Sequence, residues 1–123
     1  MANPKANPFN SSCPSQEILA LIGGKWSMLV LCILSDGPVR TGELARRAGG
    51  ISQKMLTQTL RELTRHGIVH RRDYGTVPPR VDYSLTPLGE SLSGLVRQIE
   101  NWVESNYPRM SRAARSYDAG APA

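Results

Sequence analysis

The chain has 123 residues, of which 40% are hydrophobic and 20% charged, and a formal net charge of +5. This length fits one domain with a single core, and these fractions are near the averages of globular proteins, which excludes a disordered polymer and an accessory domain. No apolar run is long enough to span a bilayer, and the first dozen residues lack the apolar core of a signal peptide. We therefore expect a cytoplasmic protein with no membrane partner.

Positive charge is concentrated in the middle of the chain. Residues 40 to 80 contain nine Lys or Arg against three acidic residues, so this segment has a net charge of nine minus three, or +6, and the rest is nearly balanced. Such a concentration suits a polyanionic partner. A solvated basic face is the alternative that charge alone leaves open.

The sequence contains two cysteines, Cys13 near the N-terminus and Cys32. Two cysteines are too few for a disulfide scaffold, and their spacing is unlike that of zinc ligands, so we predict no metal site and no cofactor. Residues 1 to 12 are expected to form a flexible arm. A short helix should follow, with Cys13 as its cap and Pro14 in the first helical position.

The next predicted elements lie between Lys25 and Ala48. A helix from Lys25 to about Ser35 is apolar on nearly every side, which predicts that it lies in the core. Turn residues end this helix, and Val39-Arg40 leaves room for only a very short strand. Thr41 is expected to cap a third helix that runs to about Ala48.

A further helix, expected from Ser52 to His66, separates apolar and polar side chains onto two faces. Gly49-Gly50 supplies the turn before it, and Ser52 is expected to be its cap. Two short helices joined by a Gly-containing turn are the helix-turn-helix pattern. The apolar face is predicted to contain Met55, Leu56, Leu60 and Leu63, and the polar face Gln53, Lys54, Thr57, Gln58 and Arg61.

The polar face of this helix suits the major groove of DNA. Lys and Arg match the hydrogen-bonding pattern of guanine, and Gln matches that of adenine. The leading residues of such a helix reach the base edges, whereas Arg61, one turn further on, is better placed for a phosphate. The predicted DNA contacts in the two helices are Thr41, Ser52, Gln53, Lys54, Thr57, Gln58 and Arg61.

Two segments of strand character follow, Ile68 to Tyr74 and Arg80 to Leu85. The prolines between them cannot donate ladder hydrogen bonds, so the tip of this hairpin should be an extended loop. Arg72 and Arg80 flank the loop and are predicted to hold the DNA backbone or minor groove as a wing. The predicted fold class is α+β, mainly α, a winged helix-turn-helix with a two-stranded hairpin.

Thr86-Pro87 predicts the start of a long helix that reaches about Tyr107, just before Pro108. The apolar stripe of this helix covers about five turns, more than one small domain can bury. We therefore predict a homodimer held by this helix and by the helix from Cys13 to Ile22. Residues 13 to 107 would form the domain, and residues 108 to 123 would form a tail that extends the helix briefly and then frays. The stripe residues predicted at the interface are Leu92, Leu95, Ile99 and Trp102.

Three stretches of the sequence resemble the HxlR family of bacterial winged-helix transcription regulators, relatives of the MarR group. They are "CPSQEILALIGGKWSMLVLCILSDGPVRTGELAR", "ISQKMLTQTLRELTRHGIV" and "VPPRVDYSLTPLGESL". The resemblance implies a homodimer whose terminal helices form the interface and whose two winged units read a palindromic operator in double-stranded DNA. It also implies that the recognition helix carries Ser52, Gln53, Lys54, Thr57 and Gln58.

In several members of that family the cysteine before a proline near the N-terminus senses electrophiles or oxidants, and here that residue is Cys13. Backbone N–H groups at a helix start stabilise the reactive thiolate, which supports this role. The alternative is a small residue that fills a gap at the dimer interface. For Cys32, which lies within an apolar helix, packing is the preferred interpretation.

The sequence contains no carboxylate pair, no nucleophile with an adjacent base and no phosphate-binding Gly loop, so we predict that the protein is not an enzyme. The preferred function is sequence-specific regulation of transcription in response to a small oxidant or electrophile. Three alternatives stay open: a ligand-responsive winged-helix regulator without thiol sensing, a thiol-dependent antioxidant protein that uses Cys13, and a protein-interaction module without operator specificity.

Overall fold

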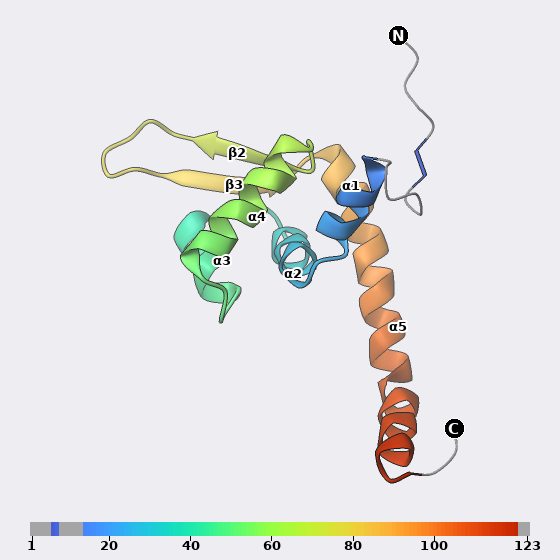
Figure 1. Ribbon diagram of the computed structural model, residues 1–123. Helices are drawn as coiled ribbons and strands as arrows, with labels where there is room; N and C mark the ends of the chain where they lie inside the picture. Colours follow the sequence, from blue (N-terminus) through green and yellow to red (C-terminus); the bar gives the residue numbers. More distant parts are fainter. Residues whose placement is uncertain (1–5, 8–13, 121–123) are drawn as a thin grey trace.

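The computed structural model describes residues 6–7 and 14–120 of the chain (Figure 1). Cys13 lies outside the described residues. In chain order the helices and strands are α1 (Ser15–Ile22), α2 (Lys25–Leu34), β1 (Val39–Arg40), α3 (Thr41–Arg47), α4 (Gln53–Arg65), β2 (Val69–Asp73), β3 (Val81–Leu85) and α5 (Pro87–Asp118).

Helix α2 forms the centre of the hydrophobic core, as its apolar sequence predicts. Val30 and Leu31 are completely buried, and Leu34 is nearly so. Because α2 is apolar on most sides, α4, α5 and the sheet can all pack against it. The residues that α4, β2 and α5 add to this core are Leu56, Leu60, Leu63, Val69 and Val96.

Helices α3 and α4 form the predicted helix-turn-helix. Gly50, in the turn, has a φ of +88°, a conformation that favours glycine over residues with a side chain. Ser52 caps α4 as predicted, because its Oγ accepts a hydrogen bond from the backbone N–H of Met55 at 3.1 Å. The turn and the cap together set the direction of α4.

The predicted capping role of Thr41 is wrong. Strand β1 ends at Arg40 and α3 begins directly at Thr41, so Arg40 occupies the cap position. The Thr41 hydroxyl instead donates to the backbone carbonyl of Val81 at 3.3 Å. This bond ties the start of α3 to the wing.

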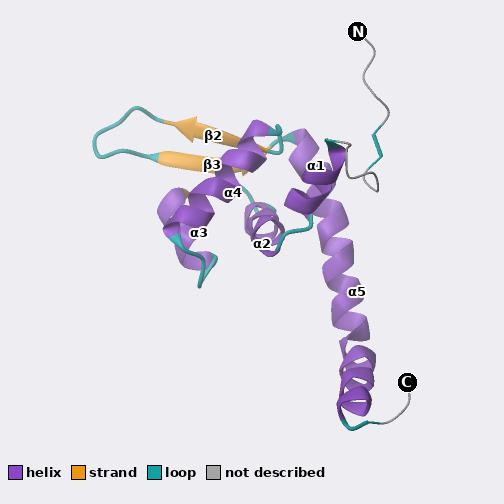
Figure 2. Cartoon of the chain, viewed as in Figure 1, coloured by secondary structure: helices purple, strands orange, loops and turns teal. Residues whose placement is uncertain are grey.

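The three strands form one antiparallel sheet in the order β1-β3-β2. The short strand predicted at Val39-Arg40 is confirmed, and it pairs with β3 on the side opposite β2. The hairpin of β2 and β3 is the predicted wing, and Figure 2 shows it extending away from the helices. Side chains alternate between the faces of a sheet. The inner face of the wing, with Arg71 and Tyr83, lines a groove beside α4, and the outer face carries Arg72 and Asp82.

Helix α5 begins where the sequence predicts and ends well beyond it. The Thr86 Oγ1 accepts a hydrogen bond from the N–H of Gly89 at 3.0 Å, and Pro87 is the first helical residue. The predicted end at Tyr107 is wrong, because the helix continues through Pro108 to Asp118. Pro108 lacks one N–H donor, but good helix formers such as Ala and Arg follow it. The second half of α5 projects away from the rest of the protein (Figure 1).

Helix α1 begins at Ser15, so Pro14 occupies the cap position. The predictions of Cys13 as the cap and of Pro14 in the first helical position are therefore wrong. Gly23 and Gly24 separate α1 from α2 as predicted, and the two helices are bent by 66°. Within the described part of the chain, no single helix has the length and apolar character needed to cross a membrane; α1 and α2 together meet that test, but only across this bend.

Candidate nucleic-acid interface

Helix α4 presents a continuous polar face to solvent. Lys54 and Gln58 are exposed, and the Nε2 of Gln53 lies 3.4 Å from the Oγ1 of Thr57. One expectation is wrong: Met55 is 40% exposed, and Thr59 is buried in its place. The buried positions are therefore Leu56, Thr59, Leu60 and Leu63, which follow one another at helical spacing. All five predicted contact residues of α4 lie outside this buried stripe: Gln53, Lys54, Thr57, Gln58 and Arg61.

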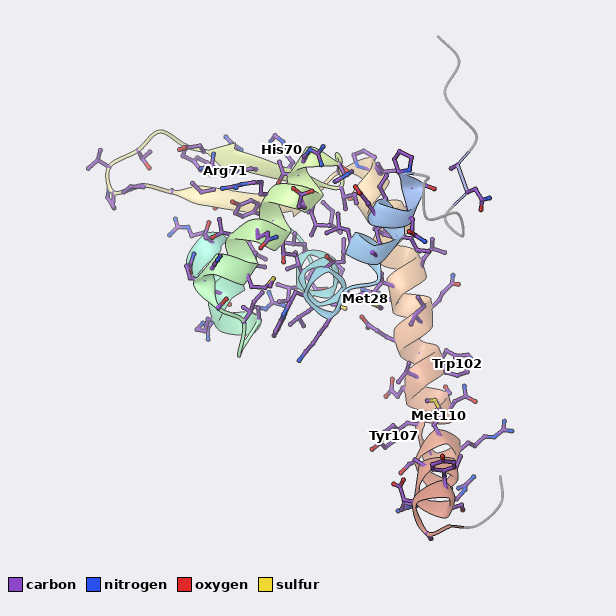
Figure 3. All side chains as sticks on the ribbon, viewed as in Figure 1. Met28, His70, Arg71, Trp102, Tyr107 and Met110 are labelled. Carbon is purple, nitrogen blue, oxygen red and sulfur yellow. The ribbon has the colours of Figure 1, made fainter. Side chains whose placement is uncertain are left out.

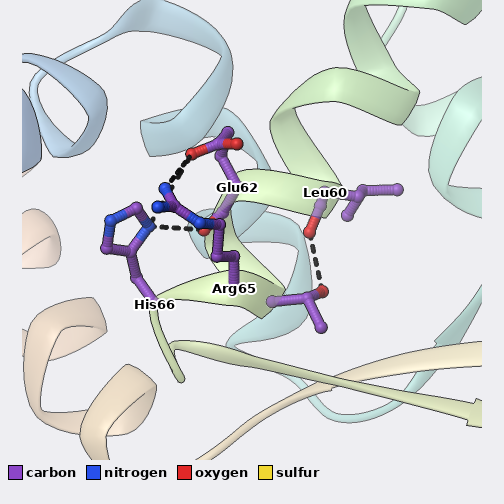
Figure 4. Close-up of polar contacts among 5 residues, drawn as sticks. Leu60, Glu62, Arg65 and His66 are labelled. Carbon is purple, nitrogen blue, oxygen red and sulfur yellow. Dashed lines mark hydrogen bonds and ion pairs between the residues drawn. The ribbon is translucent and has the colours of Figure 1, made fainter.

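The C-terminal turn of α4 is fixed by side-chain bonds (Figure 4). Thr64 Oγ1 donates to the carbonyl of Leu60 at 2.7 Å, and Arg65 forms an ion pair with Glu62 at 3.3 Å. The Nδ1 of His66 lies 2.8 Å from the Glu62 carbonyl, and His66 is the C-cap residue, in agreement with its expected position at the helix end. These bonds hold the end of α4 immediately before the wing.

A polar groove of about 440 Å³ separates α4 from the inner face of the wing. Arg61 lines it from α4, and Arg71 lines it from β2. Arg71 is labelled on the wing in Figure 3. Arg72 was predicted as a DNA contact and Arg71 was not. The alternation of the strand places the two residues on opposite faces of the wing. The lining residues of this groove are Thr57, Arg61, Thr64, Arg65, Arg71 and Tyr83.

The outer face of the wing brings Arg72 and Arg80 together at Tyr74. Each guanidinium carbon lies 4.3 Å from the centre of the Tyr74 ring. Arg80 also forms an ion pair with Asp82 at 3.3 Å, and the Tyr74 hydroxyl donates to the same carboxylate at 2.9 Å. The hydrogen bond from Arg80 holds the pKa of Asp82 below its usual value, so Asp82 is ionised at neutral pH.

Most cations of the basic segment already have an acidic partner. Arg46 binds Glu43 through a close double contact of 2.5 and 2.6 Å. Arg47, Arg65, Arg71 and Arg80 also form ion pairs. Among the residues that the structure describes, the cations of this segment without an ion pair are Arg40, Lys54, Arg61 and Arg72.

The predicted interface residues on α5 lie on its surface. Leu95, Ile99 and Trp102 are 51% to 58% exposed, whereas Leu92 is half-buried against the core. The exposed apolar side chains continue along α5 to Tyr107 and Met110 (Figure 3). This length of apolar surface lies beyond the reach of the chain's own core.

Cys32 lies on α2, where its thiol donates to the Glu100 carboxylate of α5. Burial, with the neighbouring carboxylate, raises the pKa of Cys32 to about 11. The described residues contain no cluster of three or more His, Cys, Asp or Glu that could hold a metal ion.

The sequence of the chain matches a known protein family. The family described as "HxlR-like helix-turn-helix" matches residues 21–111. The chain belongs to the HxlR family. The predicted winged-helix fold and the non-enzymatic character are confirmed, since the relatives are HTH-type transcriptional regulators.

Two transcriptional regulators are similar to this chain over most of their length. The chain is 42% identical over 106 residues to the HTH-type transcriptional regulator YtfH of Escherichia coli (strain K12), which is 86% of this chain and 84% of that protein. The solved structure of the transcriptional regulator YtfH from Salmonella typhimurium matches with a TM-score of 0.85 and 41% identity, covering 90% of this chain and 99% of that one.

The redox regulator HypR has been solved in two forms that resemble this chain. The reduced form matches with a TM-score of 0.74 and 43% identity, covering 80% of this chain and 98% of that one. The oxidised form matches with a TM-score of 0.69 and 47% identity, covering 76% and 97%.

Proposed function

We propose that the protein regulates transcription by binding a palindromic operator in double-stranded DNA as a homodimer, with α4 of each subunit in the major groove. The observation that carries this proposal is the outer face of α4, where Lys54 and Arg61 have no ion pair among the described residues. Cations that no carboxylate of the protein neutralises are available to base edges and phosphates. As a regulator of transcription, the protein would act in the cytoplasm, with the DNA.

The proposed contacts divide by position. Gln53, Lys54, Thr57 and Gln58 would read bases, because they lie in the first turns of α4. Arg61 and Arg71 would hold a phosphate in the groove between α4 and the wing. Thr41 and Ser52 stand at helix starts, where backbone N–H groups suit a phosphate oxygen.

The homodimer is supported by the apolar surface of α5. Large exposed apolar side chains in one continuous patch mark interaction sites in soluble proteins. Leu95, Ile99 and Trp102 form such a patch with the half-buried Leu92, and Ile18 of α1 is also exposed. A second copy would bury these residues, and its symmetry would set two half-sites about one turn of DNA apart, on the order of 34 Å.

Regulation by an oxidant or electrophile would act through Cys13. The residue precedes Pro14 and the start of α1, and one similar protein, HypR, is a redox regulator. The raised pKa of Cys32 favours Cys13 as the thiol that reacts at neutral pH. Because Cys13 lies outside the described residues, this part of the proposal rests on its position in the sequence.

A second candidate is a regulator that responds to a small ligand without thiol sensing. A cavity of about 340 Å³ lies between α1, the end of α4 and the start of α5. Apolar cavities with few polar groups are typical of small-molecule sites. Its lining residues are Ile18, Ile22, His66, Ile68, Leu88, Ser91, Leu92 and Leu95.

Selection from a pool of random duplexes, followed by binding titrations, tests both the proposed DNA recognition and the proposed sensing by Cys13. Wild-type protein should enrich one DNA sequence, and its affinity for that duplex should fall with salt. Diamide should release wild type and Cys32→Ser from DNA but leave Cys13→Ser bound. Reduction should restore DNA binding. Release of all three proteins would refute sensing by Cys13, and release of none would favour the ligand cavity.

A further inference from the structure

A carboxylate lies at the centre of the basic outer face of the wing. Asp82, on the middle strand β3, is only 7% exposed. It pairs across the sheet with Arg40 on β1 and with Arg72 on β2. Residues directly opposite one another in antiparallel strands project on the same face, so Asp82 stands between two arginines.

Asp82 binds two side chains directly. Arg80 Nη2 lies 3.3 Å from its Oδ2, and the Tyr74 hydroxyl donates to the same oxygen at 2.9 Å. The backbone N–H of Tyr74 also donates to the carbonyl of Arg80 at 3.0 Å. Tyr74 is therefore fixed at both its backbone and its hydroxyl, and its ring cannot turn without breaking the bond to Asp82.

Arg72 depends on this ring for its position. Within the described residues it forms no ion pair, and its guanidinium carbon lies 4.3 Å from the ring centre of Tyr74. A guanidinium over an aromatic face keeps its positive charge and its N–H groups for a further partner. Arg80 contacts the same ring, but its charge is matched by Asp82.

We propose that Asp82 is a positioning residue for DNA binding, which fixes Arg80 and Tyr74 so that Tyr74 presents the Arg72 guanidinium to a DNA phosphate. This inference rests on the proposed function, because it requires that the wing contact DNA. It separates two residues to which the sequence assigned one role. Arg72 is the phosphate ligand, and Arg80 belongs to its support.

Charge alone predicts the opposite effect of losing Asp82. An acidic group near a polyanion repels it, so Asp82→Asn would strengthen DNA binding if the carboxylate had no positioning role. If the carboxylate positions Tyr74 and Arg80, the same substitution weakens binding. The sign of the change therefore distinguishes the two explanations.

The test is a DNA-binding titration at several salt concentrations, with the duplex selected by wild type and with one random duplex. Asp82→Asn should bind both duplexes about threefold to tenfold more weakly, and the slope of log affinity against log salt should fall by about one. Glu43→Gln is the matched control, because Glu43 is also paired with an arginine but lies on α3. It should bind as tightly as wild type or more tightly.

Four further variants test the route through Tyr74. Arg72→Gln should lose as much affinity as Asp82→Asn, and the double variant should lose no more than Arg72→Gln alone. Tyr74→Phe, which keeps the ring but lacks the hydroxyl, should lose less than Tyr74→Leu. Equal or tighter binding by Asp82→Asn, or additive losses in the double variant, would overturn the inference.

The two proposals fail in different ways. If wild type enriches no sequence, the proposed operator recognition fails, whereas the random duplex still reports on the wing. If circular dichroism shows that Asp82→Asn does not fold, the Tyr74 variants test the inference instead. Equal DNA affinity of Tyr74→Leu and wild type would then overturn it.

Discussion

Gly89, in the first turn of α5, lies against the backbone carbonyl of Ile68 with no space for a side chain between them. Ile68 directly precedes β2, and the backbone N–H of Thr86 donates to its carbonyl at 3.1 Å. The contact therefore fixes where α5 leaves the wing. It joins the helix proposed for dimerisation to the hairpin proposed for DNA binding.

Gly89→Ala should destabilise the fold, because the new methyl group meets backbone atoms that cannot move independently. We expect a loss of about 1–3 kcal/mol in the free energy of unfolding, measured by urea titration. Gly94→Ala is the control on the same helix, since nothing lies within 4 Å of its new Cβ. It should be neutral or stabilising by up to about 1 kcal/mol. Equal effects of the two substitutions would contradict the close contact.

Lys54 and Arg61 should affect DNA binding in different ways. Lys54→Ala should cost about 1–3 kcal/mol at a cognate base pair and relax the sequence preference. Arg61→Ala should weaken all sequences alike and lower the salt slope by about one. Arg46→Ala is a control with a smaller expected effect, because Glu43 already pairs with Arg46. The same change of specificity in Lys54→Ala and Arg61→Ala would refute the division between base and phosphate contacts.

Ile99→Asp should dissociate the dimer or unfold it, because it introduces an unpaired charge into the proposed interface. Sedimentation at micromolar concentration would report the mass of each species. Val77→Asp adds the same charge at a wing residue that is 98% exposed, and it should stay dimeric. A stable wild-type monomer at this concentration is the result that would exclude the dimer.

Cys32 should be almost unreactive at neutral pH. With its pKa raised to about 11, roughly one thiol in a thousand is ionised at pH 8. In Cys13→Ser, alkylation of Cys32 should therefore accelerate as the pH rises from 8 toward 11, and Glu100→Gln should shift this profile to lower pH. Because the folded pKa exceeds the ordinary value of 9.0, the contribution to stability is complete below pH 9 and is lost as the pH rises through 11. A profile that levels off near the ordinary value of 9.0, or one that Glu100→Gln leaves unchanged, would contradict the Cys32–Glu100 contact.

Apolar periodicity was sufficient to predict much of the fold. The continuous apolar character of α2 indicated its central position, and the polar face and cap of α4 followed from spacing alone. Pro108 shows the limit of a local rule. The missing N–H of a proline usually ends a helix, but the residues that follow it favour helix strongly enough for α5 to continue.

The wing was harder to predict because its chemistry depends on strand register. An aspartate in a strand is normally assigned to the solvent face, and Asp82 does project there, yet the side chains around it leave only 7% of it exposed. Tyr74 and Asp82 come together only when β2 and β3 pair in this register, and Arg80 contacts both of them. Arg71 was missed for the same reason, since its groove forms only when β2 packs beside α4.

The central proposal is that two copies of α4 read one two-fold DNA site. Its most direct test is selection of duplexes from a random pool by wild-type protein, followed by footprinting of the enriched sequence. We expect two inverted half-sites whose centres are about 34 Å apart, protected together by one dimer. Recovery of no preferred sequence, or of a single asymmetric site bound by one chain, would contradict it.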